Sequence, residues 1–247
     1  DGLITLEGAD WNRHRRIIQP SFSSSFLKDT LNKSVPSKAN QLVRCWKEKK
    51  GREIDVASHT SAITLDVIGD VGFGHQFHGM AEIEKWVKDE GSDKPAELED
   101  PFISSIIQSL KPNMLTFFLS TVGMAAFDNK LNPKSVKCSR LVDKAVDDVV
   151  MNAKKSTEKD KSLLQLLLSA TDTDPNNKKA RKLSHAELKD ETKTFLVAGH
   201  ETTSTWCYWA LYALAKHPDI QEKVCADIMK HSKGSNTIDF EMVDDME

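Results

Sequence analysis

The sequence predicts a mainly α-helical protein in which one long helix runs through the centre. Apolar residues recur at the three- and four-residue spacing of a helix along most of the 247 residues. Glycine (11 residues) and proline (8 residues) fall below their ordinary usage, which disfavours a turn-rich β-sandwich. The one segment that indicates a strand is Leu3-Ile-Thr-Leu6, where we expect an edge strand.

The first part of the chain predicts three helices, and proline or glycine residues mark their ends. These helices are Trp11–Gln19, Lys28–Lys50 and Ser58–Val71. Pro20 closes the first and Gly51 the second, because proline cannot continue the helical hydrogen bonds and glycine favours a helix end. The third helix is apolar on most sides, as a buried helix is, and Gly72-Phe-Gly74 interrupts it.

The middle of the chain predicts two polar connections and several shorter helices. The connections are Gly91–Glu99 and Asp172–Lys182, and the helices are the apolar Phe102–Phe127 (one or two helices around Pro112), the amphipathic Ser135–Ala153 and the short apolar Leu163–Ala170. Polar residues with glycine or proline dominate both connections, which therefore read as surface segments.

The longest predicted helix begins at a capping box, in which Ser184 precedes Glu187 by three residues. Its helical pattern continues to His217, and Pro218 ends it. At 1.5 Å per residue, about 32 residues form a rod of about 48 Å. The second half carries few charges, so we expect this helix to run through the core of a large domain. One more helix is expected at Asp219–Lys230.

Composition excludes two classes of protein and indicates the redox state of the cysteines. The 34 Lys and Arg residues against 37 Asp and Glu give a net charge of −3, which excludes a strongly basic nucleic-acid binder. With 39% hydrophobic residues, the chain is not a disordered one either. The four cysteines, at positions 45, 138, 207 and 225, form no C-x-x-C pair, so we expect reduced thiols, a cytosol-facing environment and no metal site.

The ends of the chain and its most apolar run bear on membrane attachment. Asp1 is not an initiator methionine, and Phe240–Glu247 reads as the start of an acidic helix, so we expect a piece of a longer protein. Met114–Phe127 is the most apolar run, and its length of about 14 residues falls short of the about 20 that span a bilayer. No membrane-spanning segment is therefore expected within the chain.

The first candidate site is the basic segment Trp11-Asn-Arg-His-Arg-Arg16. Helical spacing puts four of its residues on one face: Trp11, His14, Arg15 and Ile18. An arginine one turn from a tryptophan suits an anion held at the rim of a buried pocket. The alternative is a solvated basic helix anchored by one core tryptophan, which this motif alone favours. Arg13 and Arg16 point away from this face in either case.

The second candidate site lies in the middle of the long helix, where Ala198, Glu201 and Thr202 share one face. The small residues Ala198 and Gly199 would let a flat molecule press against the helix, and an acid beside an alcohol is suited to relaying protons. The alternative is that Thr202 bonds the carbonyl of Ala198 while Gly199 permits a close helix crossing. Ser204 stands where H-E-x-x-H requires its second histidine, so we expect no zinc site.

Together these motifs resemble those of the cytochrome P450 family of haem-thiolate monooxygenases. Four segments carry the resemblance in the family's order: the haem-propionate helix with Trp11-x-x-x-Arg15, the buried helix Thr64–Gly74, the oxygen-activation signature A/G-G-x-D/E-T-T/S at Ala198–Thr203, and Ala215–Lys223 after the long helix. The resemblance covers nearly the whole chain. It implies an incomplete cytochrome P450-like helical domain over residues 1–247.

The resemblance also implies roles for particular residues and for a cofactor, haem. The implied haem-binding residues are Trp11, Arg15, Ala198 and Gly199, and the implied catalytic residues are Glu201 and Thr202, which would deliver protons to dioxygen. Two later signatures of the family, E-x-x-R and the cysteine loop F-x-x-G-x-x-x-C-x-G, do not occur in this sequence. The resemblance therefore implies an internal fragment without the cysteine that ligates the iron, and we expect the fragment alone to be inactive.

The implied activity is insertion of one oxygen atom from O₂ into a small apolar substrate. The implied partner is an NADPH-dependent reductase, and we expect Arg13 and Arg16 on the outer surface to contribute to its docking. The family's microsomal members imply the cytosolic face of the endoplasmic reticulum membrane. The alternative, from another class, is a non-enzymatic helical scaffold, although a scaffold gives no reason for a glutamate in the middle of a core helix.

Overall fold

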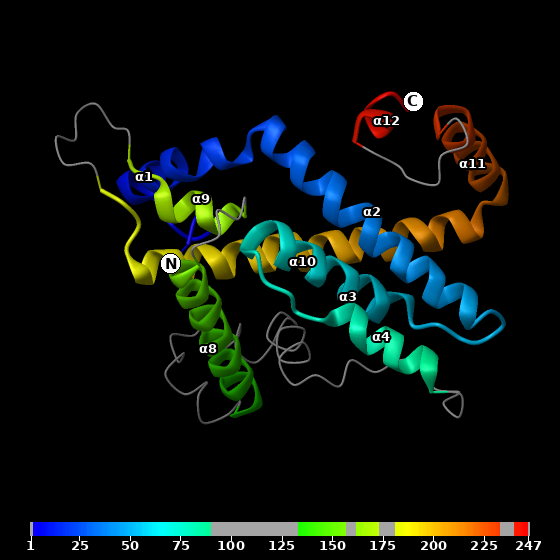
Figure 1. Ribbon diagram of the computed structural model, residues 1–247, viewed down its shortest axis with the longest axis horizontal. Helices are drawn as coiled ribbons and strands as arrows, with labels where there is room; N and C mark the ends of the chain where they lie inside the picture. The colour runs from blue at the N-terminus through cyan, green and yellow to red at the C-terminus, as the bar shows by residue number, and fades with distance from the viewer. Residues whose placement is uncertain (1, 90–132, 157–161, 173–180, 233–239, 247) are drawn as a thin grey trace, which may run out of the picture.

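The computed structural model describes residues 2–89, 133–156, 162–172, 181–232 and 240–246 (Figure 1). All regular secondary structure in these ranges is helical, which confirms the predicted fold class. The predicted connection Gly91–Glu99, the predicted helices at Phe102–Phe127 and most of Asp172–Lys182 lie outside the described residues. No helix in the described ranges is long and apolar enough to cross a bilayer.

The amino-terminal end forms α1 (Gly8–Ile18) and the short 3₁₀ helix η1 (Gln19–Phe22), close to the predicted Trp11–Gln19. The edge strand expected just before α1 is wrong. Residues 3–5 form a turn in which the amides of Thr5 and Leu6 donate to the carbonyl of Gly2, at 2.9 and 3.0 Å. A strand needs a neighbour to pair with, and the described residues include none.

The next elements are α2 (Ser24–Glu48), α3 (Val56–Ile68), the π-helical turn η2 (Gly69–Phe73) and α4 (Gly79–Lys88). α2 and α3 confirm two predicted helices, and both start before the predicted residues. The earlier starts have a local cause, because Ser23 and Asp55 accept hydrogen bonds from the first turns of α2 and α3. Most of α3 is buried, as its sequence indicates.

Helix α4 was not predicted, because its amino-terminal cap comes from another helix. The buried carboxylate of Asp66, on α3, accepts from the amides of Gly79 and Met80 at 2.7 and 2.9 Å. Gly79 also lies so close to α3 that an added Cβ would be 2.8 Å from the carbonyl oxygen of Ala62. These contacts fix α4 against α3.

The remaining described elements are α8 (Pro133–Lys155), α9 (Leu163–Ser169), α10 (His185–Lys216), α11 (Pro218–Ser232) and α12 (Phe240–Asp244). The capping box predicted for the long helix is present, with Ser184 and Glu187 bonding each other's backbone amides. Pro218 ends α10 by beginning α11, also as predicted.

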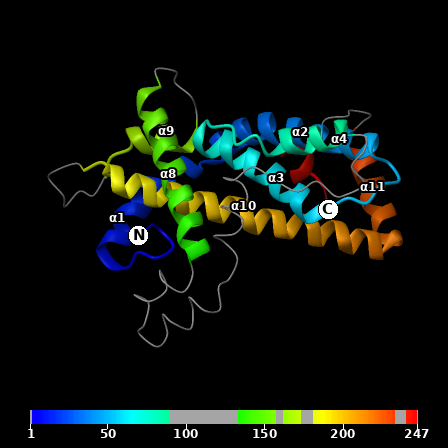
Figure 2. The same ribbon diagram turned by 90° about the horizontal axis from the view of Figure 1, so that it is seen from below.

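Helix α10 is the spine of the molecule, and α3 runs along it (Figures 1 and 2). One apolar core lies where α10 meets α1, α8, α9 and η2, and contains Ile17, Leu164 and Leu196. A second core lies between α2, α3 and α4 around Met80 and Ile83. Beyond Ser204 the helix leaves both cores, and several large side chains become exposed: Trp206, Trp209 and Tyr212 on α10 and Met229 on α11.

Candidate functional site

One stripe of α10 passes from full burial to exposure along its length. Glu191, Phe195, Ala198 and Thr202 lie four, three and four residues apart, so they share one face of the helix. Glu191 is fully buried and Phe195 half-buried, whereas Ala198 and Thr202 are exposed. The amino-terminal end of this stripe is therefore covered, and the part that carries the predicted catalytic motif is open.

The cover is α1 with η1, which crosses the stripe at Glu191 and Phe195. His14 of α1 is buried, and its Nδ1 lies 2.6 Å from the carboxylate of Glu191. The ring of Phe22, in η1, lies 5.7 Å from the ring of Phe195. Beyond this second contact α1 and η1 no longer cover α10, and the open stripe with Ala198 begins.

The structure divides the face on which Trp11, His14, Arg15 and Ile18 were expected together. His14 and Ile18 face the core, Trp11 is half-buried, and Arg15 is exposed. The guanidinium of Arg15 lies over the Trp11 ring at 5.1 Å from its centroid, a cation–π contact. Within the described residues no carboxylate forms an ion pair with Arg15.

Arg13 and Arg16 do not form the exposed pair that was expected. Arg13 is buried and forms an ion pair with Glu187 at the start of α10. Arg16 is bound by the buried carboxylate of Asp172 through two hydrogen bonds of 3.1 and 3.3 Å. Both arginines point away from Arg15 as expected, but their side chains contact carboxylates of the protein and do not form a free surface patch. The predicted position on the outer surface is therefore wrong for Arg13, whereas Arg16 is half-exposed. The docking role itself stays a prediction.

The acid and the alcohol of the predicted catalytic motif are both exposed on α10. The hydroxyl of Thr202 donates to the carbonyl of Ala198 at 2.5 Å, which is the local bond considered as an alternative for this residue. That bond uses the hydroxyl hydrogen and leaves the oxygen lone pairs able to accept from a water or another donor. Glu201 forms no ion pair with any described residue and faces solvent.

The neighbouring Gly199 and His200 face α3 instead of the open stripe. An added Cβ at Gly199 would be 2.7 Å from Cδ1 of Ile68, so glycine at this position permits the close crossing of the two helices. His200 is fully buried, and its Nε2 lies 2.8 Å from the hydroxyl of Ser61. Burial lowers the pKa of His200 to about 4, so its imidazole is neutral at physiological pH.

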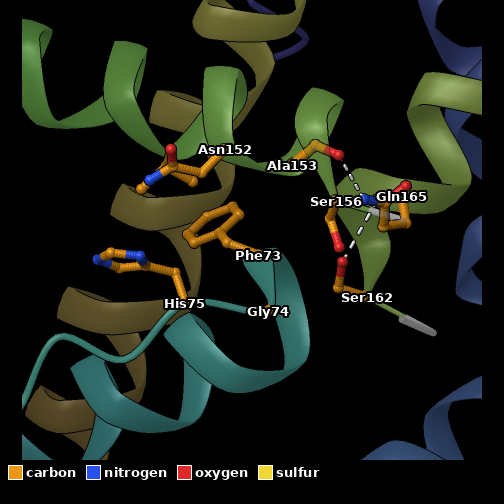
Figure 3. A pocket seen from close by; sticks show the side chains of 9 residues that line it. Phe73, Gly74, His75, Asn152, Ala153, Ser156, Ser162 and Gln165 are labelled. Carbon is orange, nitrogen blue, oxygen red and sulfur yellow. Dashed lines mark hydrogen bonds between the residues drawn. The ribbon is translucent and has the colours of Figure 1, made fainter. Parts of the chain in front are cut away.

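A separate small cleft of about 140 Å³ lies between η2, α8 and α9 (Figure 3). Its walls carry amide, hydroxyl and imidazole groups from Asn152, Ser156 and His75. Gln165 closes one side by donating to the carbonyl of Ala153 at 2.6 Å. Burial lowers the pKa of His75, so the cleft carries no charged group. None of the predicted site residues lines it.

No group of three described His, Cys, Asp or Glu residues is arranged to hold a metal ion. All four cysteines are free. Burial raises the pKa of the Cys45 and Cys207 thiols, which favours their protonated forms.

The described residues form a helical fold in which an exposed arginine of α1 stacks on an aromatic ring. A stripe of α10 exposes a small residue beside a hydroxyl. The family model for cytochrome P450 matches residues 1–247, and the chain belongs to this family. The match confirms the family resemblance found in the sequence.

Known proteins similar to the chain agree with this assignment. Human cytochrome P450 4Z1 is 29% identical over 96% of this chain and 45% of its own length. Echinocystic acid 23-monooxygenase of Saponaria officinalis is 29% identical over 97% of this chain and 45% of its own. The crystal structure of a cytochrome P450DA mutant haem domain matches the fold with a TM-score of 0.78 at 24% identity, over 100% of this chain and 50% of that one. The chain thus spans about half the length of these proteins.

Haem is the cofactor that the family implies, and the residues at the open stripe fit it. The unpaired Arg15 suits a propionate, and the exposed Ala198 leaves room for a flat ring beside the helix. The structure also brings two buried residues, His14 and Glu191, into contact on this stripe, a contact that the sequence did not predict. Glu191 could have been found from its place seven residues before Ala198, on the same stripe.

Proposed function

We propose that the full-length protein containing this chain is a haem-dependent monooxygenase that inserts one oxygen atom from O₂ into an apolar organic substrate. The observation that carries the proposal is that α1, which carries Arg15, crosses α10 at Glu191, on the same stripe that exposes Ala198 and Thr202. Membership of the cytochrome P450 family and a relative named as a monooxygenase support the same activity.

In this proposal residues of α1 and of the open α10 stripe bind the cofactor. Arg15 and the indole of Trp11 hold a propionate, and Ala198 gives the porphyrin a close approach to the helix. Gly199 contributes only its backbone, because Ile68 fills the side where a side chain would stand. When bound, haem iron supplies the binding and reductive activation of O₂.

Glu201 and Thr202 transfer protons on the exposed part of α10. The carboxylate of Glu201 faces solvent, from which it can take up a proton, and it lies one residue from Thr202. Thr202 Oγ1 is held in place by its bond to the Ala198 carbonyl and can orient a water molecule through its lone pairs. A carboxyl group that exchanges protons with solvent and a fixed hydroxyl together form a short proton path.

The proposal extends to the partners and location of the full-length protein. The electrons come from an NADPH-dependent reductase, and the protein works at the cytosolic face of the endoplasmic reticulum membrane; the family resemblance supports both. The cysteine that would ligate the haem iron would come from outside this chain. Cys45 and Cys207 disfavour the thiolate form, and none of the four cysteines is followed by glycine at the second position.

A carbon monoxide spectrum tests this function. The full-length protein, reduced and treated with carbon monoxide, is expected to show the Soret band of a thiolate-ligated haem, whereas the 247-residue chain given haem is not, because it offers no poised thiolate. Absence of the band from the full-length protein would contradict the function. A stoichiometric band from the 247-residue chain would contradict the assignment of the ligand to another segment.

A further inference from the structure

The crossing of α1 over α10 holds a buried polar junction that binding and catalysis, as proposed above, do not use. Its four side chains are Arg13 and His14 of α1 and Glu187 and Glu191 of α10. Glu191 is fully buried, and the exposed fractions of His14 and Arg13 are 2% and 9%. Removing so many polar groups from water is costly unless they are hydrogen-bonded, and among the buried side-chain atoms of the junction all but Nη1 of Arg13 have a partner.

The hydrogen bonds of the junction define the state of His14. A guanidinium only donates, so the Arg13 nitrogen 2.9 Å from Nε2 of His14 requires that nitrogen to accept. In that arrangement the Nδ1–H of His14 donates to Glu191 at 2.6 Å. The second oxygen of Glu191 accepts from the amide of Leu3 at 3.2 Å. Each oxygen of Glu191 thus has its own donor.

This pairing requires a carboxylate at position 191. A glutamine there has one acceptor oxygen and one donor nitrogen, so it can serve either His14 or the Leu3 amide, but not both. At the other end of the junction, Glu187 binds Arg13 and the amide of Ser184. Burial alone would raise the pKa of Glu187, but these donors outweigh it and lower the pKa to about 2, so this anchor stays charged.

The junction lies next to both walls of the proposed haem site. Arg15 follows His14 directly in α1, about 100° further round the helix. Glu191 precedes Ala198 by two turns on the same stripe of α10, about 10.5 Å along the axis. A rotation or slide of α1 on α10 would therefore change the place of Arg15 relative to Ala198, and the His14–Glu191 bond lies where that movement would occur.

We propose that His14 and Glu191 are positioning residues, whose buried hydrogen bond fixes α1 on α10 and thereby sets Arg15 at the distance from the α10 stripe that a bound haem requires. This inference rests on the proposed function. It assigns no contact between His14 and haem, because His14 faces Glu191 and Arg13. Its effect reaches the cofactor only through Arg15.

The test is a double-mutant cycle on the rate of haem loss from the full-length protein to excess apomyoglobin. We expect His14→Leu to accelerate haem loss about tenfold, close to the effect of Arg15→Ala, which corresponds to about 1.4 kcal/mol. The double variant is expected to lose haem no faster than either single variant, because both remove the same contact. His14→Asn, whose amide can still donate to Glu191, is expected to restore slow release.

Ser61→Ala is the matched control. It removes another buried hydrogen bond of α10, to His200, but on the side of α3 and away from α1. It is expected to lower the unfolding temperature while changing haem loss less than about twofold, because it leaves α1 in place. If His14→Leu does not accumulate as folded protein, His14→Phe replaces it in the cycle, since phenylalanine keeps an aromatic ring at this position and cannot donate to Glu191.

The outcomes separate this inference from the proposed function. If Arg15→Ala accelerates haem loss but His14→Leu, or His14→Phe in its place, does not, the positioning role is wrong and the proposed function stands. Effects of His14→Leu and Arg15→Ala that multiply in the double variant, or a Ser61→Ala effect as large as that of His14→Leu, also overturn it. A full-length protein that holds no haem overturns both. An Arg15→Ala variant that retains haem normally overturns the positioning role and the assignment of Arg15 to the haem site, and leaves the proposed activity standing.

Discussion

Replacing Glu201 by glutamine is expected to lower the turnover of the full-length protein about ten- to a thousandfold. The substitution keeps the shape of an exposed side chain and removes the group that can carry a proton, whose contribution in general acid–base catalysis is typically about 10²–10⁴-fold. Glu201 has no ion pair with the described residues, so we expect no change in the free energy of unfolding. Product formation under saturating substrate and reductase measures the effect.

The companion substitution, Thr202→Ala, is expected to separate reductant consumption from product formation. Without the hydroxyl, water at the stripe loses its fixed partner, and hydrogen peroxide should accumulate in place of product. Thr202→Ser keeps the hydroxyl and serves as the control, with coupling near that of the wild type. Unchanged coupling in Thr202→Ala would instead assign the hydroxyl to its 2.5 Å bond with the Ala198 carbonyl.

The largest expected loss of stability comes from Asp66→Ala, in α3. The substitution leaves the amides of Gly79 and Met80 without their acceptor in a buried environment. Each unsatisfied buried donor costs about 1–3 kcal/mol, so we expect the free energy of unfolding to fall by about 2–5 kcal/mol. The midpoint of urea unfolding, followed by circular dichroism, measures the loss.

Two further variants sharpen the Asp66 result. Asp66→Asn keeps one acceptor oxygen and is expected to lose less than Asp66→Ala. Asp143→Ala removes the ion pair with Lys193 at a half-exposed position, where such pairs contribute about 0–1 kcal/mol. A loss in Asp66→Ala no larger than in Asp143→Ala would contradict the assignment of Asp66 as the cap that holds α4.

Local signals in the sequence were sufficient to locate most of the helices. The capping box of Ser184 and Glu187 lies within the sequence of α10 itself, so pattern reading found it. Helix α4 has no such signal, because Asp66 lies 13 residues before the amide it caps. The turn expected as a strand shows the same dependence on distant residues, since the Leu3 amide is bound by Glu191, 188 residues away.

The candidate site was predicted in part for a related reason. Helical spacing shows which residues share a face, but it does not show which face meets the core. Arg13, a charged residue, was therefore placed outside, whereas Glu187 pairs with it inside. Conversely, the spacing correctly put Ala198 and Thr202 on one face, and only the structure shows that α1 stops covering that face just before them.

The most direct measurement of the central claim is a crystal structure of the full-length protein with its haem. We expect a propionate within hydrogen-bond distance of Arg15 and the porphyrin lying along the α10 stripe at Ala198 and Thr202. A haem bound elsewhere, or protein side chains filling the space between Arg15 and Ala198, would contradict the account.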